Sequence, residues 1–171
     1  MSLIVLSKNS YFRIAFLSIY HQIMKRERLC VIDVSSFLTL NDIRCAIKKA
    51  NANQQYNVIL FGGRDICSRI LQPFGVHSID LPVGKIKRLI RKTQSIESLL
   101  NHLNYCRALT PLSCHEHTLV RFLRTEQTLK DAASKMKMSE RTFYYKVHRA
   151  ALKLNLRTGK EFHWFLYCEY N

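Results

Sequence analysis

Short apolar runs alternate with amphipathic stretches through roughly the first 105 residues. Apolar runs at residues 2–6, 29–34, 56–61 and 76–81 predict buried strands. Residues 11–24, 40–50, 64–71 and 95–103 have apolar positions three and four apart and predict helices, with Asn41 or Asp42 able to cap the second. Residues 84–92 fit either a basic strand or a loop. This alternation predicts an α/β domain over residues 1–104, a parallel sheet with helices on both faces.

The strand pattern disappears from residue 112 onward. Residues 114–124, 129–136, 140–154 and 159–168 predict four helices. The change predicts a short linker at 105–111 and an all-α domain over 112–171.

Capping residues support the helix starts in this second region. Ser113 and Glu116 fit a capping box, Thr128 is followed three residues later by Asp131, and Ser139 precedes the longest helix. That helix has a single apolar stripe, which predicts its core face: Phe143, Val147, Ala150, Ala151 and Leu154.

Composition narrows the class of partner. The 171 residues include 27 Lys and Arg against 12 Asp and Glu, a net charge of +15, yet 47% are hydrophobic, enough for a packed core. Such a charge favours nucleic acid first and an anionic membrane second. No apolar run reaches the roughly 18 residues of a membrane span, and the N-terminus does not fit a signal peptide. We therefore expect a cytoplasmic protein whose six cysteines are reduced.

The third and longest of these helices is the best candidate for nucleic-acid contact. From Lys130 to Lys153 there are seven basic residues and two acidic ones. A short helix, a tight turn at Lys137–Met138 and a longer basic helix form a helix-turn-helix pattern, whose second helix fits the major groove.

The motifs of this region resemble the LuxR/FixJ-type DNA-binding domain over residues 112–166. The similar segments are Leu112–Glu116, Leu119-Val120, Ala132-Ala133, Met138–Phe143 and Leu152–Leu156. The sequence departs from the family in lacking the usual helix-ending glycine near Glu126 and in having the bulky pair Tyr144-Tyr145. The second departure implies a different base preference.

The resemblance implies two groups of DNA contacts. Bases would be contacted by Tyr144, Tyr145 and His148. Phosphates would be contacted by Lys130, Ser139, Arg141, Thr142, Lys146, Arg149 and Lys153. The alternative is that the two tyrosines are partly buried, the charges form a solvated face, and His148 is an ordinary surface histidine.

The first 104 residues are similar to a response-regulator receiver domain, with Lys92 at the position of the receiver's lysine. The acidic pair expected to hold Mg²⁺ falls on Ser7 and Lys8, and the phospho-acceptor position falls at Phe61 or Gly62. Asp33 and Asp65 are the nearby carboxylates. We therefore expect a degenerate pseudo-receiver that neither binds Mg²⁺ nor accepts phosphate.

The same half carries a run of positive charge that could contact DNA, an acidic partner or only water. Its members are Lys85, Lys87, Arg88, Arg91 and Lys92. Contact with water alone is the favoured interpretation of a lone charge run.

Other chemistry is poorly supported. Cys114, His115 and His117 lie close together, with Cys106 as the nearest further ligand, but capping and packing already account for this segment, so we expect no metal site. Neither a catalytic triad nor a glycine-rich phosphate loop is apparent. We expect no enzyme activity and no cofactor.

The sequence thus predicts a bacterial transcription regulator that binds promoter DNA as a homodimer, or as a heterodimer with a response regulator. One alternative is a protein–protein adaptor that modulates another regulator without reading DNA. A small-molecule sensor is the second alternative, although the βα half fits it poorly.

Overall fold

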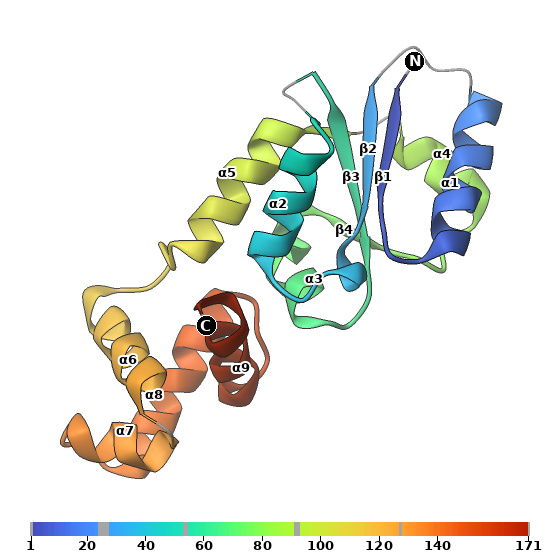
Figure 1. The fold of residues 1–171 in the computed structure, drawn as a ribbon. Helices are drawn as coiled ribbons and strands as arrows, with labels where there is room; N and C mark the ends of the chain where they lie inside the picture. Colours follow the sequence, from blue (N-terminus) through green and yellow to red (C-terminus); the bar gives the residue numbers. More distant parts are fainter. Residues whose placement is uncertain (1, 24–27, 53–54, 91–92, 127, 171) are drawn as a thin grey trace. The chain divides into compact units, whose positions relative to one another are not determined.

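The computed structural model describes residues 2–23, 28–52, 55–90, 93–126 and 128–170 (Figure 1). The chain forms two compact units, Met1–Asn104 and Tyr105–Asn171, and each is described by itself. No helix among the described residues is long and apolar enough to cross a lipid bilayer.

A sheet forms the centre of the first unit. Four parallel strands lie side by side in chain order: β1 (Leu3–Leu6), β2 (Leu29–Asp33), β3 (Asn57–Gly62) and β4 (Val76–Ser78). Leu29 of β2 is paired with Leu3 on one side and with Asn57 on the other, so β2 is an interior strand. A fifth strand, β5 (Gln94–Ser95), pairs with the start of β3 in the antiparallel sense. The sheet is therefore mixed, whereas the sequence predicted a parallel one.

Helices cover both faces of this sheet. Figure 1 shows α1 (Ser10–Ile23) and α4 (Val83–Leu89) on one side, and α2 (Leu40–Lys49) and α5 (Ile96–Arg107) on the other. Successive side chains of a strand point to opposite faces of the sheet, so a separate hydrophobic core lies on each face. The core under α1 and α4 contains Phe12, Phe16, Val31, Phe61 and Ile86. A short helix, α3 (Ile66–Ile70), follows β3.

The strand order has a topological consequence. The chain steps from β1 to β2 to β3 in one direction, but α1 and α2 lie on opposite faces (Figure 1). The crossover connections β1–α1–β2 and β2–α2–β3 therefore have opposite handedness. One of the two departs from the right-handed crossover that parallel strands usually have. The order also differs from the 2-1-3-4-5 order of flavodoxin-like sheets, in which the first strand is interior.

Several predicted boundaries need correction. Residues 84–92 were predicted as strand or loop, but Val83–Leu89 is helix α4, with Ile86 and Ile90 buried one turn apart. Helix α2 is capped by Thr39, not by Asn41 or Asp42; Asp42 instead completes the capping box from inside the first turn. Helix α5 continues to Arg107, so the first residues of the expected linker are helical, and the boundary between the compact units falls within this helix.

The second unit contains the helices α6 (Cys114–Thr125), α7 (Leu129–Lys135), α8 (Glu140–Lys153) and α9 (Gly159–Tyr170). Phe143 and Phe162 are fully buried between them. The Glu169 carboxylate, with no exposed side-chain surface, forms an ion pair with Arg107, and the Tyr170 hydroxyl donates a hydrogen bond to the Arg107 carbonyl. These bonds hold the end of α9 against the last turn of α5.

Candidate nucleic-acid interface

The turn between α7 and α8 fixes how α8 starts. Lys137 adopts a left-handed conformation with φ of 51°. The Met138 amide donates to the Ala133 carbonyl and the Lys137 amide to the Ser134 carbonyl, the bond pattern of a Schellman C-cap. Ser139 then caps α8 by accepting a hydrogen bond from the Thr142 amide at 3.3 Å. The turn predicted at Lys137–Met138 is therefore present.

Small residues let α8 pack closely against its neighbours. Ala132 and Ala133 of α7 are buried, as is the α8 stripe containing Phe143 and Val147. A Cβ added to Gly159 at the start of α9 would lie 2.9 Å from Val147 Cγ1, too close for any larger residue without movement. This packing fixes the rotation of α8 and decides which of its side chains face outward.

All ten residues predicted to contact DNA are exposed on the second unit. Tyr144 is 47% exposed and Tyr145 is 61% exposed, so both rings are accessible at the surface of this unit. The remaining eight are Lys130, Ser139, Arg141, Thr142, Lys146, His148, Arg149 and Lys153.

Helical spacing sorts the α8 residues into two neighbouring stripes. Positions three or four apart lie on the same side of a helix. One stripe is Arg141, Tyr145, His148 and Leu152; the other is Thr142, Lys146, Arg149 and Lys153. We call the second the cationic stripe. Tyr144 lies beside the first stripe, and Arg149 connects the two, because its guanidinium lies 5.9 Å from the Tyr145 ring centroid.

Ion pairing differs among these cations. Lys153 Nζ lies 2.6 Å from a Glu116 carboxylate oxygen, and Lys130 Nζ lies 3.9 Å from Glu140 in an exposed and therefore weak pair. Among the described residues, Arg141 and Lys146 form no ion pair. Lys153 is therefore partly neutralised, whereas Arg141 and Lys146 keep their full charge for a ligand.

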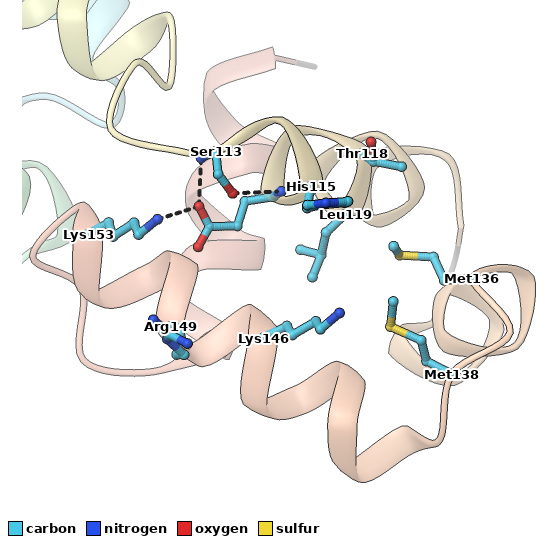
Figure 2. A pocket seen from close by; sticks show the side chains of 10 residues that line it. Ser113, His115, Thr118, Leu119, Met136, Met138, Lys146, Arg149 and Lys153 are labelled. Atoms are coloured by element: carbon cyan, nitrogen blue, oxygen red, sulfur yellow. Dashed lines mark hydrogen bonds and ion pairs between the residues drawn. The ribbon is translucent and has the colours of Figure 1, made fainter.

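Glu116 is the acidic residue beside the cationic stripe. Its carboxylate accepts from the Ser113 amide at 2.7 Å and from Lys153, and Ser113 caps α6 in return, so the predicted capping box is present (Figure 2). Burial alone would raise the pKa of Glu116, but the hydrogen bonds from Lys153 and Ser113 outweigh burial and lower it. Glu116 is therefore ionised and already paired at neutral pH.

A hollow of about 370 Å³ lies between α6, the α7–α8 turn and the cationic stripe (Figure 2). Its lining includes Lys146, Arg149 and Lys153, together with apolar side chains from Leu119, Met136 and Met138. Sequence reasoning did not find this hollow, because its walls come from three separate segments. The pair of methionines flanking the turn was the one local signal.

Two carboxylates at the carboxyl-terminal edge of the sheet, those of Asp33 and Asp65, accept hydrogen bonds from serine hydroxyls. Asp33 is buried, and its Oδ2 accepts from Ser7 at 2.7 Å and from Ser36 at 2.6 Å. Asp33 Oδ1 has no hydrogen-bond partner among the residues that the structure describes. The Ser7 hydroxyl is therefore engaged in a hydrogen bond to Asp33. Lys8, the next residue, is exposed.

Asp65 lies at the same edge of the sheet, where it is the N-terminal cap of α3. Its carboxylate accepts from the Ser68 amide at 2.8 Å, from the Ser68 hydroxyl and from the Ser35 hydroxyl. Burial would raise the pKa of Asp65, but these hydrogen bonds lower it overall. Phe61, one of the two positions expected for a phospho-acceptor, is fully buried, and a Cβ on the other, Gly62, would overlap Ser68.

Several other predicted features can be placed. Lys85, Lys87 and Arg88 lie in α4, while Arg91 and Lys92 fall outside the described residues. In the part of the chain that the structure describes, no three His, Cys, Asp or Glu side chains come together as a metal site. Cys106 is buried and Cys114 exposed.

Comparisons with known proteins place the fold. No protein-family model and no curated protein matches the sequence. The solved structure of the two-component response regulator RcsB bound to DNA aligns with 98% of this chain and 98% of its own, with a TM-score of 0.62 and 15% identity. A structure of RcsB from Salmonella typhimurium aligns over the same share of both chains with a TM-score of 0.35 and 14% identity. The first of these two alignments supports a response-regulator-like fold for the chain.

Proposed function

We propose that this response-regulator-like chain is a bacterial transcription regulator that binds promoter DNA through its second unit. In this proposal α7 and α8 act as a LuxR-type helix-turn-helix, with α8 in the major groove. The N-terminal unit supplies contacts to a second copy or to a response regulator. The protein would act in the cytoplasm.

The outward face of α8 carries the proposal. Two adjacent stripes, almost free of acidic residues, present Arg141, Lys146 and Arg149 beside two exposed tyrosines. Unpaired cations suit phosphate oxygens, and aromatic and imidazole groups suit base edges and thymine methyls. The net charge of +15 supports a polyanionic partner. One structural neighbour, aligned over 98% of both chains, is a response regulator in complex with DNA, which favours DNA over the adaptor alternative.

We infer dimeric binding from the length of DNA that one recognition helix can contact. One recognition helix covers about half of a typical operator, so a two-fold symmetric site needs two copies. We propose a homodimer or a heterodimer with a response regulator.

We further propose that the N-terminal unit works without its own phosphorylation. Ser7 and Lys8 stand where an acidic pair would hold Mg²⁺, and the carboxylates at this edge are already bonded to serines. Incubation with radiolabelled acetyl phosphate and Mg²⁺ should leave the protein unlabelled. Stoichiometric label on Asp33 or Asp65 would overturn this part of the proposal.

The DNA-binding proposal is tested by capture of sheared genomic DNA with the purified full chain at near-physiological salt, followed by sequencing. We expect a few promoter sites that share a two-fold symmetric motif. Enrichment only after addition of cell extract, with an asymmetric motif, would identify a heterodimer. No enrichment with or without extract, from a folded protein, would overturn the proposal and favour the adaptor.

A matched pair of variants assigns any binding to α8. Arg141→Gln and Arg13→Gln each remove one exposed positive charge, the first from α8 and the second from α1 in the other unit. Only Arg141→Gln should weaken capture of the enriched sites. Equal weakening by both would mean that overall charge, not α8, determines binding.

A further inference from the structure

The hollow beside α8 combines an apolar wall with unpaired positive charge. Leu119, Met136 and Met138 supply carbon and sulfur atoms, and Figure 2 shows these side chains and the Lys146 amine pointing toward a common space. At about 370 Å³ it falls within the range of about 300–1,000 Å³ typical of small-molecule sites.

The charge of the hollow selects an anion. Lys146, Arg149 and Lys153 contribute three cations against the single carboxylate of Glu116. That carboxylate already accepts hydrogen bonds from Lys153 and from the Ser113 amide. Lys146 forms no hydrogen bond or ion pair with the described residues, and Arg149 has only the Tyr145 ring nearby. An incoming carboxylate would therefore meet Lys146 and Arg149 without displacing an existing hydrogen-bond or ion-pair partner.

The apolar wall selects the rest of the ligand. Leu119 is already buried, but Met136 and Met138 are partly exposed, and a phosphate or chloride ion would leave these two methionines in contact with water. An aromatic or branched hydrocarbon body would bury them, and thioethers make favourable contacts with aromatic rings. The size of the hollow fits a ligand of one or two rings.

We propose that this hollow binds a compact organic carboxylate with an aromatic or branched apolar body, whose charge pairs with Lys146 and Arg149. On the proposed DNA-binding function, on which this consequence rests, the ligand competes with DNA, because Lys146, Arg149 and Lys153 serve both. Binding of either would weaken binding of the other by the same factor. The hollow would thus be an effector site inside the DNA-binding unit.

The methionines allow a direct test on the full chain. The sequence has four, and two of them, Met136 and Met138, line the hollow, whereas Met1 and Met24 precede residue 105 in the sequence. We expect 2-naphthoate, titrated into protein with ¹³C-labelled methionine methyls, to shift the Met136 and Met138 signals in a saturable manner and to leave the other two unmoved. The Met138→Leu variant assigns the signals. The neutral analogue 2-naphthamide should bind at least about tenfold more weakly.

Two charge-matched variants make the test specific. Lys146→Gln should raise the dissociation constant for 2-naphthoate about tenfold, whereas Arg141→Gln, on the other stripe of α8, should leave it unchanged. Both side chains are exposed, so both variants should fold, as circular dichroism would verify. Absence of saturable shifts, shifts at all four methionines, or equal weakening by both variants would overturn the proposal. The titration contains no DNA, so its outcome is independent of the DNA-binding proposal.

Discussion

Phe143 and Tyr144 are adjacent aromatic residues of α8 with opposite environments. Phe143 is fully buried, whereas Tyr144 is 47% exposed. Replacing either with alanine improves intrinsic helix propensity by about 0.5 kcal/mol. Removing the buried ring destabilises a core by about 3–5 kcal/mol, through lost burial and the cavity that remains. Removing the exposed ring should change stability by less than about 1 kcal/mol.

These magnitudes are large relative to the stability of the second unit. A unit of about 67 residues has a free energy of unfolding of about 3–10 kcal/mol. Phe143→Ala should therefore leave this unit marginally stable or unfolded, and Tyr144→Ala should leave it folded.

Urea unfolding measures the difference. The single tryptophan, Trp164, lies in α9 and so reports on the second unit. For a slope of about 1–1.5 kcal/mol per molar urea, the midpoint should fall by roughly 2–4 M for Phe143→Ala and by less than about 1 M for Tyr144→Ala. Similar midpoints for the two variants would refute the assignment of the core stripe, and with it the outward position of Tyr144.

Three further outcomes are expected. Arg149→Ala should weaken binding to all DNA sequences and reduce the slope of log binding constant against log salt concentration by about one unit. Tyr145→Ala should instead change sequence preference and cost roughly 1–3 kcal/mol of binding free energy on the cognate site. Equal effects of both variants on all DNA sequences would contradict these roles. Lys137→Gly should raise the Trp164-reported unfolding free energy by up to about 1 kcal/mol, since glycine tolerates the positive φ; a decrease would contradict the left-handed cap. Because the pKa of Asp65 is lowered on folding, its ionised form stabilises the first unit above about pH 4, and this contribution disappears as the pH falls through the lowered value. Asp65→Asn should therefore weaken the dependence of stability on pH in that acidic window, measured by circular dichroism, and an unchanged dependence would refute the assignment.

The sequence predicted the starts of α6, α7 and α8 well because a capping residue precedes each of these helices. Ser113, Thr128 and Ser139 all cap the helices they were expected to cap. Helix α4 lacks this signal: its cap, Pro82, makes no side-chain hydrogen bond, and within the helix only Ile86 is buried. A short basic segment of this kind is locally ambiguous, and packing against α1 decides its conformation.

Features that join distant segments were not predicted. The interior position of β2 depends on which strands pair with each other. The apolar patterns of β1 and β2 are similar, so they do not indicate which of the two strands lies inside the sheet. The hollow beside α8 depends on α6 and the α7–α8 turn lying together, which no local spacing encodes. Exposure of Tyr144 and Tyr145 likewise depended on the rotation of α8 and was left open by the sequence.

The chain-order arrangement of the strands affects how the first unit can fold. Leu3 pairs with Leu29, Leu29 with Asn57, and Leu60 with Val76, so each parallel pairing closes a loop of fewer than 30 residues. A sheet with the first strand inside would need a first-to-third pairing across about twice that length, at an added entropic cost of about 0.6 kcal/mol. Low contact order favours fast folding. The four parallel strands can therefore be added one strand–helix step at a time, each pairing with the strand that precedes it in the chain, whereas β5 pairs with β3.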